Sequence, residues 1–273
     1  MDISFVMLGS GAVRNNPRRG GPAQILKIDD RVLMFDCGRY SCTSLGCAGI
    51  KVEEVNRLFL THLHFDHIIG VPYFALLGWN NGRKNLLRIF GPEGTELFVT
   101  RAIRPPLEQD LKSRFGHGKD PFGLDPEVTE IPEEGNFFNE EGYSISAIFT
   151  EHGAMPTLVY RVDVDDRRIV ITGDCTPSPK LTEFRQDADL LVCECSGTPE
   201  FLAQYPWGSW HTTPKDLAKT ASEAGVKKVM TKHFVIEDIT GDITAVQLMA
   251  EQIRQDYDGE VIVGEDGLEV SIL

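Results

Sequence analysis

The sequence predicts a layered α/β protein, and three observations support this prediction. Short apolar runs rich in β-branched and aromatic residues recur along the chain, a pattern typical of buried strands. Helix-like stretches lie between many of these runs. Paired runs such as 23–28 and 32–35, separated by Asp29-Asp30, indicate hairpins. Because hairpins join antiparallel strands, we expect a mixed sheet rather than a purely parallel one.

Each element follows from the same patterns. Strands are expected at residues 3–8, 23–28, 32–35, 57–60, 87–90, 143–149, 158–164, 169–171, 190–193, 228–230, 261–263 and 268–272. Helices are expected at residues 66–78, 94–103, 179–186, 214–224 and 243–257. The fourth helix has the clearest boundaries, because Thr213-Pro214 is a start signal and Gly225 follows its end.

The chain of 273 residues is expected to form a single domain over 1–273. The segment 104–138 is rich in Pro and Gly and is expected to be irregular. A long segment without regular structure inside a compact domain is often a lid or a dimer contact, and a plain surface insertion is an equal alternative.

Composition limits the function. Apolar residues make up 41% and charged residues 25% of the chain, which is ordinary for a globular protein. No apolar run approaches the roughly 18 residues that a membrane span needs. The opening MDISFVMLGSG lacks the pattern of an export signal, so a cytoplasmic location is expected. The net charge of −14 argues against nucleic acid as a partner, since phosphate contacts supply most of that affinity, but it permits a small anionic substrate.

The strongest functional signal is the run from His62 to His67, His-Leu-His-Phe-Asp-His. It lies between an expected strand and an apolar helix, where side chains project at a sheet edge. His62 and His64, two positions apart in an extended segment, can point the same way, whereas Asp66 and His67 turn toward a second position. Imidazole and carboxylate suit zinc, and also manganese or iron. The run therefore predicts a metal site.

Further metal-ligand residues follow other expected strands. His152, Asp174 and His233 each come after an apolar run, at the position where sites of α/β proteins assemble. The run from His62 to His67 supplies too few ligands for two metals. These three residues would complete the site of a two-metal hydrolase.

The order HxHxDH, then His, Asp and His, resembles the metallo-β-lactamase fold superfamily. The similarity extends from Leu8-Gly9-Ser10-Gly11 to Val263-Gly264-Glu265-Asp266-Gly267. The stretch 188–195, followed by His211-Thr212-Thr213, resembles the ribonuclease Z-like and cyclic phosphate phosphodiesterase branch. The resemblance implies a four-layer αβ/βα sandwich, in which two mixed sheets carry helices on their outer faces and the metals lie at one edge.

The resemblance also implies a complete set of metal ligands and two Zn²⁺ ions, with Mn²⁺ or Fe as alternatives. The set comprises His62, His64 and His152 for one ion, Asp66, His67 and His233 for the other, and Asp174 as the bridge. In this scheme a metal-bridging hydroxide attacks the substrate.

Three residues are candidates for catalysis. Asp66 would orient or deprotonate the nucleophile, and His211 would protonate the leaving group as a general acid. Glu194 would hold His211 in place, and a purely structural carboxylate is its alternative role. His117, in a glycine-rich stretch, has no assigned role.

The loop 9–22 carries Arg14, Arg18 and Arg19. It lacks the GK[ST] of a nucleotide-binding P-loop. One of these arginines could bind a substrate phosphate, and a solvated loop is the equal alternative.

The resulting prediction is a dinuclear metal-dependent hydrolase acting on a small phosphodiester, cyclic and nucleotide forms included. Lactone, ester or amide hydrolysis on the same metals is the alternative, which an apolar pocket lined by Trp79, Trp207 or Trp210 and lacking arginine would favour. Ribonuclease Z-type tRNA 3′-processing is less favoured, because the 22 positions between His152 and Asp174 leave no room for a tRNA-binding arm. A metal-binding protein without turnover is the least favoured. The family suggests a homodimer.

Overall fold

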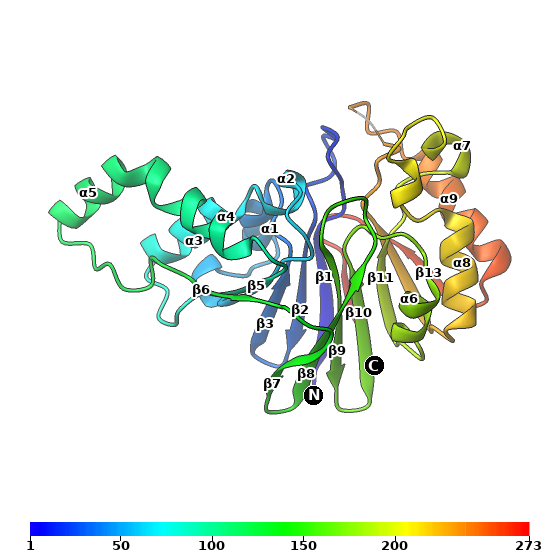
Figure 1. Ribbon diagram of the computed structural model, residues 1–273, viewed down its shortest axis with the longest axis horizontal. Helices are drawn as coiled ribbons and strands as arrows, with labels where there is room; N and C mark the ends of the chain where they lie inside the picture. Colours follow the sequence, from blue (N-terminus) through cyan, green and yellow to red (C-terminus); the bar gives the residue numbers. More distant parts are fainter. Residues whose placement is uncertain (238, 273) are drawn as a thin grey trace.

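Two facing sheets form the centre of the molecule in the computed structural model, which describes residues 1–237 and 239–272. Within these residues each sheet has seven strands. Helices cover the outer face of each sheet (Figure 1). The predicted four-layer αβ/βα sandwich is therefore confirmed. Among the described helices, none is long and apolar enough to cross a membrane.

Each sheet combines hairpins with parallel strands. The first sheet runs, in spatial order, β14 (Glu269–Ser271), β1 (Ile3–Gly9), β2 (Ala23–Ile28), β3 (Arg31–Phe35), β4 (Arg57–Phe59), β5 (Arg88–Gly91) and β6 (Glu127–Glu130). The second runs β13 (Glu260–Val263), β12 (Lys228–Lys232), β11 (Leu190–Glu194), β10 (Arg167–Thr172), β9 (Thr157–Val164), β8 (Tyr143–Thr150) and β7 (Gly135–Glu140). Strands β3 to β6 are parallel, as are β10 to β13, so their carboxyl ends gather at one edge.

The helices belong to two groups. The first sheet carries α1 (Ser41–Cys47), α2 (Phe65–Ile68), α3 (Val71–Asn80), α4 (Thr95–Ile103) and α5 (Glu108–Gly116). The second carries α6 (Pro179–Phe184), α7 (Pro199–Leu202), α8 (Pro214–Glu223) and α9 (Thr244–Asp256). Helix α8 begins at the predicted place, where Thr213 and Asp216 form a capping box. Gly225 follows it with a φ of 63°, a conformation that glycine adopts without strain.

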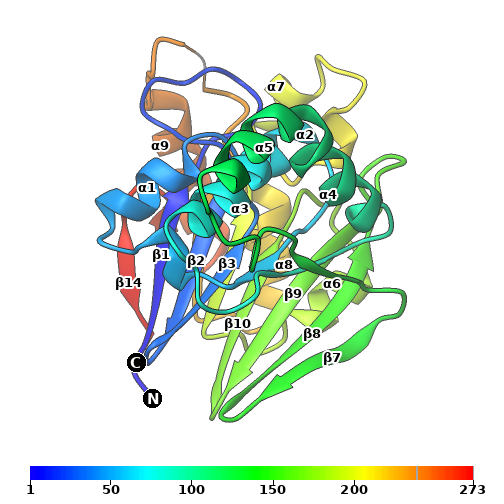
Figure 2. The same ribbon diagram turned by 90° about the vertical axis from the view of Figure 1, so that its left-hand side faces the viewer.

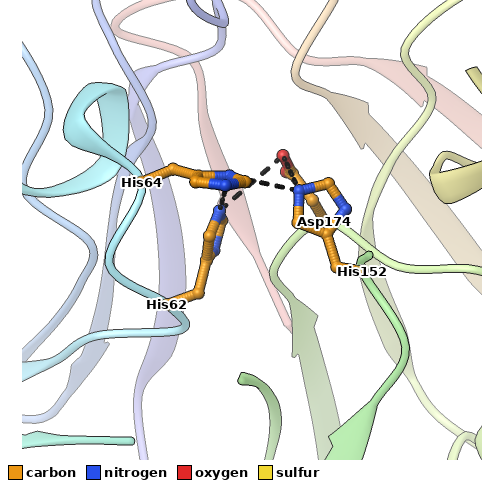
Figure 3. A group of neighbouring side chains, drawn as sticks. All are labelled: His62, His64, His152 and Asp174. Atoms are coloured by element: carbon orange, nitrogen blue, oxygen red, sulfur yellow. Dashed lines mark hydrogen bonds and ion pairs between the residues drawn. The ribbon is translucent and has the colours of Figure 1, made fainter. Parts of the chain in front are cut away.

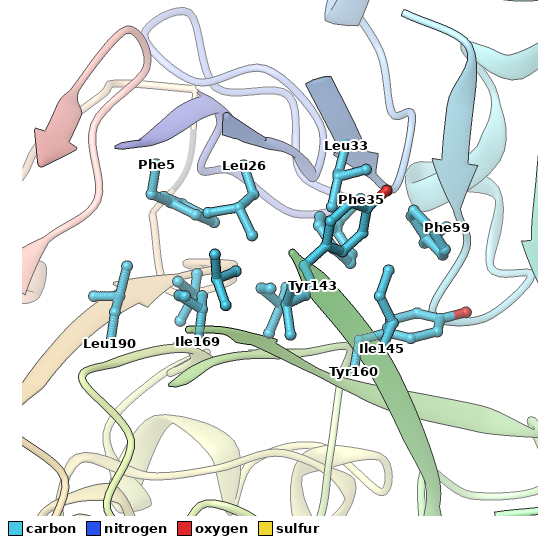
Figure 4. Packing of buried hydrophobic residues seen from close by; sticks show 14 of the residues in the cluster. Phe5, Leu26, Leu33, Phe35, Phe59, Tyr143, Ile145, Tyr160, Ile169 and Leu190 are labelled. Carbon is cyan, nitrogen blue, oxygen red and sulfur yellow. The ribbon is translucent and has the colours of Figure 1, made fainter. Parts of the chain in front are cut away.

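Aromatic side chains from both sheets meet in the core between them (Figure 4). The ring centroids of Phe35 and Phe59 are 5.2 Å apart, and that of Tyr160 in β9 lies 5.7 Å from Phe59. The Tyr160 hydroxyl donates a hydrogen bond of 2.7 Å to the carbonyl oxygen of Leu60. The core therefore anchors the chain directly before the histidine run.

The segment 104–138 is more regular than the sequence predicted. It contains α5, β6 and part of β7, and α5 projects away from the sheets (Figures 1 and 2). Strand β6 forms by pairing in parallel with β5 at the sheet edge. Its residues Glu-Val-Thr-Glu carry little apolar signal because an edge strand is largely exposed. A role for this segment as a lid or dimer contact stays a prediction.

Candidate metal centre and its pocket

Four strand ends bring the predicted ligands together. The histidine run follows β4, His152 follows β8, Asp174 follows β10 and His233 follows β12. His233 adopts a φ of 61°, which a residue other than glycine rarely does. Its backbone N–H donates to the carbonyl oxygen of Ser10 at 2.8 Å. The loop after β1 thereby holds His233 at the common edge of both sheets.

The first ligand group is His62, His64, His152 and Asp174, which offer ligand atoms within 4.8 Å of one another. Nδ1 of His64 lies 3.1 Å from Nε2 of His62 and 3.2 Å from Nε2 of His152. Figure 3 shows the three rings converging on the Asp174 carboxylate. Three histidines from two sheets thus surround one small volume.

The second group is Asp66, His67 and His233, again with ligand atoms within 4.8 Å. Nε2 of His233 lies 3.4 Å from Oδ2 of Asp66 and 3.3 Å from Oδ2 of Asp174. Oδ1 of Asp174 lies 3.4 Å from Nε2 of His67. Asp174 therefore lies between the two groups.

Unsatisfied polar atoms show that these residues fit a metal. Among the described residues, Nε2 of His67 and Oδ1 of Asp174 are buried without a hydrogen-bond partner, which is rare for buried polar atoms. Burial lowers the pKa of His62 well below its usual range, and His67 adds to the effect. Burial alone would raise the pKa of Asp174, but His233 and His67 bring it well below normal. His62 and Asp174 therefore have the forms that bind metal, neutral imidazole and ionised carboxylate. Burial alone would lower the pKa of His67, but Asp174 and Asp36 raise it to about 10, so His67 would release a proton when metal binds.

Asp36 and Thr61 support the ligands, and neither was predicted from the sequence as a site residue. Oδ2 of Asp36 lies 2.8 Å from Nδ1 of His67, and Oδ1 accepts from the Thr61 N–H at 2.8 Å. The Thr61 hydroxyl lies 3.0 Å from Nδ1 of His62. The sequence signal for Asp36 was an aspartate placed directly after an apolar strand. In the structure its side chain is fully buried. Such contacts orient metal-binding histidines.

Glu194 and His211 form a buried pair beside the metal ligands. Nδ1 of His211 lies 3.2 Å from Oε1 of Glu194. His211 also groups with Asp174 and His233 within 4.8 Å. Burial alone would lower the pKa of His211, but the charge and hydrogen bond of Glu194 raise it to about 9. Burial alone would raise the pKa of Glu194, but His211 lowers it overall. In the metal-free protein, the pair therefore favours a protonated imidazole at neutral pH.

A cavity of about 280 Å³ opens over the ligands. Its apolar wall is formed by Val13, Phe65, Trp207, Trp210 and Val235. Phe65 is 63% exposed and Trp210 40% exposed, so both rings are available to a ligand. A Cβ atom on Gly153 would lie 2.9 Å from the Trp210 ring, so the ring packs closely on this glycine. Among the described residues that line the cavity, none is Lys or Arg.

The structure places the candidate arginines outside this lining. Arg19 is buried and forms an ion pair of 2.7 Å with Glu237. Arg14 donates to the Tyr205 hydroxyl at 3.1 Å, and Arg18 is exposed. The guanidinium of Arg19 is therefore occupied by Glu237, and a phosphate contact by one of the three arginines stays a prediction.

Two other residues named in the sequence analysis, His117 without a role and Trp79 as a possible pocket residue, lie away from the cavity. His117 is exposed at the end of α5, where Nδ1 lies 2.7 Å from the carbonyl oxygen of Ser113. Trp79 is buried, and its indole N–H donates to the carbonyl oxygen of Asp120. Trp79 belongs to the core beneath the helices of the first sheet. Neither residue contributes to the site.

Fold and site together define a metal-dependent hydrolase of the metallo-β-lactamase fold, in its ribonuclease Z-like branch. Residues 3–247 match the family described as Anti-Pycsar protein Apyc1, and the chain belongs to this family. Ribonuclease Z of Mycobacterium marinum is 26% identical over 97% of this chain and 96% of its own.

Solved structures agree with this placement. The metallo-β-lactamase fold protein YhfI from Bacillus subtilis has a TM-score of 0.80 at 16% identity, covering 99% of this chain and 100% of its own. The short form of human tRNase Z, ELAC1, has a TM-score of 0.76 at 25% identity, covering 99% of each chain. Both similarities extend over the whole sandwich.

Proposed function

We propose that this hydrolase cleaves a small phosphodiester with two metal ions bound at the two ligand groups. Zn²⁺ is the expected metal, and Mn²⁺ or Fe are alternatives. The observation that carries the proposal is the place of the Glu194–His211 pair. It puts a protonated imidazole within 4.8 Å of Asp174, the residue between the two groups. An alkoxide leaving group needs such a proton donor.

The catalytic candidates of the site then have defined tasks. Two divalent ions lower the pKa of water and stabilise charge on the phosphoryl oxygens. Asp66 orients the attacking water or accepts its proton. His211 donates a proton to the departing oxygen, and Glu194 holds Nδ1 of His211 so that the other ring nitrogen serves the pocket. The apolar wall around the ligands excludes water from the remaining space.

The pocket supports a small substrate. Its volume of about 280 Å³ accommodates one phosphodiester and a flat organic group, which Phe65 and Trp210 can contact with their exposed rings. Cyclic and nucleotide phosphodiesters have this form. The net charge of −14 and the absence of Lys and Arg among the described lining residues disfavour a nucleic-acid strand, and with it tRNA processing of the kind that ribonuclease Z performs.

The same pocket favours a second candidate function, the hydrolysis of a lactone, ester or amide. A wall containing Trp207 and Trp210, without arginine among its described residues, suits a neutral substrate. The ions would polarise a carbonyl as readily as a phosphoryl group. The similarity to ribonuclease Z favours the phosphodiester, since a proton donor at His211 would serve an alkoxide leaving group in either reaction.

Activity of the metal-loaded protein tests these candidates. Bis-p-nitrophenyl phosphate is assayed beside an aryl ester and a lactone, after loading with Zn²⁺ or Mn²⁺. We expect the phosphodiester to be cleaved fastest. His152→Ala should abolish this activity by removing a ligand, whereas His117→Ala, which alters a distant exposed histidine, should leave it unchanged. Brisk lactone opening without phosphodiester cleavage would establish the second candidate, and inactivity toward all three substrates would refute both.

A single domain, a homodimer and a cytoplasmic location complete the proposal. Light scattering during size-exclusion chromatography measures the oligomeric state, and cell fractionation the location. A dimer should have twice the chain mass of 30.4 kDa.

A further inference from the structure

One buried hydroxyl contacts three groups of the site. Oγ of Ser196, just after β11, lies 2.7 Å from Oε2 of Glu194, 3.1 Å from Nδ1 of His211 and 3.0 Å from Nδ1 of His233. Ser196 is completely buried. The rings of His211 and His233 are nearly parallel, at 19°, with centroids 5.7 Å apart. Both rings therefore present the same nitrogen to one oxygen.

The hydrogen atom of this hydroxyl has one acceptor. A serine hydroxyl donates once and accepts twice. The carboxylate of Glu194 already accepts from the backbone N–H groups of Cys175, at 3.1 Å, and Thr212, at 2.9 Å. Such contacts favour the ionised form, which only accepts. Ser196 thus donates to Oε2 of Glu194, its shortest contact, and its oxygen is left to accept from both imidazoles.

We propose that Ser196 is a positioning residue whose hydroxyl accepts a hydrogen bond from Nδ1–H of His211 and of His233 together. For His233, this contact favours the Nδ1–H tautomer, which leaves on Nε2 the lone pair that a metal ion would need between Asp66 and Asp174, at 3.4 and 3.3 Å from this nitrogen. For protonated His211, it leaves Nε2–H available to the pocket. The inference rests on the proposed function for the roles of both histidines. It links a metal ligand to the proton donor through one oxygen.

The two histidines depend on Ser196 to different degrees. Nδ1 of His211 has a second acceptor in Oε1 of Glu194, at 3.2 Å. For Nδ1 of His233, by contrast, the described residues provide no hydrogen-bond partner other than Ser196. Loss of the hydroxyl should therefore release the tautomer of His233 and leave the hydrogen bond from Nδ1 of His211 to Glu194 in place.

Long-range ¹H–¹⁵N NMR of the zinc-loaded protein tests this directly, because it shows which imidazole nitrogens carry a hydrogen. In the wild type we expect both histidines to carry a hydrogen on Nδ1. In Ser196→Ala, a fraction of His233 should carry its hydrogen on Nε2 instead. Ser196→Thr keeps the hydroxyl and should restore the wild-type spectrum. Ser146→Ala removes a different buried hydroxyl, from β8, and should change neither histidine. Thermal unfolding verifies that each variant is folded.

Metal affinity gives the second readout. In Ser196→Ala, competition with a chromophoric chelator should show one of the two ions bound about 10- to 100-fold more weakly, and Ser196→Thr should bind both normally. An unchanged His233 tautomer with unchanged affinity would overturn the proposal. A folded Ser196→Thr as impaired as Ser196→Ala would also overturn it, by assigning the effect to packing. Neither readout depends on the bond cleaved, so a wild type inactive toward phosphodiesters would refute the proposed function alone.

Discussion

Oδ2 of Asp36 lies 2.8 Å from Nδ1 of His67, while Nε2 of the same ring lies 3.4 Å from Oδ1 of Asp174. The carboxylate of Asp36 accepts a hydrogen from Nδ1, so Nε2 is the nitrogen that His67 would offer to a metal in the second ligand group. Asp36 also accepts from the Thr61 N–H. One carboxylate before the histidine run therefore orients the chain that carries the run.

The first prediction concerns this contact. Asp36→Asn should lower the affinity for the ion bound by His67 about 10- to 100-fold, because a neutral amide holds the imidazole less firmly. Asp36 has a φ of 56°, which asparagine tolerates, so the backbone should be preserved. Chelator competition measures the affinity, with Asp30→Asn in an exposed turn as the control. Equal affinities in both variants would contradict the assigned role.

The second prediction separates proton donation from metal binding. His211→Ala should lower kcat about 10²- to 10⁴-fold for a phosphodiester with an alkoxide leaving group. The loss should be much smaller with bis-p-nitrophenyl phosphate, because p-nitrophenolate departs without a proton. Glu194→Gln should show the same selectivity to a lesser degree. Steady-state kinetics on the two substrates provides the comparison, and an equal loss on both would exclude the general-acid role.

Much of this site could be predicted from the sequence because its signals are local. His62 to His67 are adjacent in the chain, and His152, Asp174 and His233 follow strands whose apolar pattern is clear. Strand ends meet at a sheet edge whatever the loop lengths, so the grouping of these residues follows from the fold class.

The contacts that the sequence could not reveal are distant in the chain. Arg19 is neutralised by Glu237, which is 218 positions away, and no local pattern indicates this pairing. The Phe65 and Trp210 rings share a pocket only because the fold brings the start of α2 next to the segment that follows α7. Strand β6 exists because β5 offers it an edge. Long-range packing decided each of these features.

The third prediction concerns the aromatic wall. Trp210→Ala should lower kcat/KM for a phosphodiester that carries a flat aromatic group, by about 5- to 150-fold, since stacking on an aromatic side chain contributes about 1–3 kcal/mol. A dialkyl phosphodiester should be affected far less. Phe122→Ala removes another exposed aromatic side chain, outside the pocket, and serves as the control. Equal loss on both substrates would show that Trp210 supports the ligands rather than the substrate.

The last prediction concerns stability and pH. Asp189 directly precedes β11 and is buried. Its carboxylate accepts hydrogen bonds from Lys227 Nζ at 2.7 Å and from the Arg168 N–H at 2.8 Å. Burial alone would raise the pKa of this carboxyl, but the two hydrogen bonds lower it overall. The ionised form therefore stabilises the fold above the unfolded pKa of about 3.9, and this stabilisation is lost as pH falls through the lower folded value.

Asp189→Asn should reduce the free energy of unfolding of the metal-free protein by about 1–2 kcal/mol at pH 7. The difference from wild type should shrink below pH ~4, where the unfolded carboxyl becomes protonated first. Urea titrations across this range measure it. Asp166→Asn, which alters a highly exposed partner of Arg167, should change stability by less than about 0.5 kcal/mol. If the free energies of unfolding of wild type and Asp189→Asn differ by the same amount at acid pH, the effect comes from packing. Loss of the charge alone predicts that the two values become equal there.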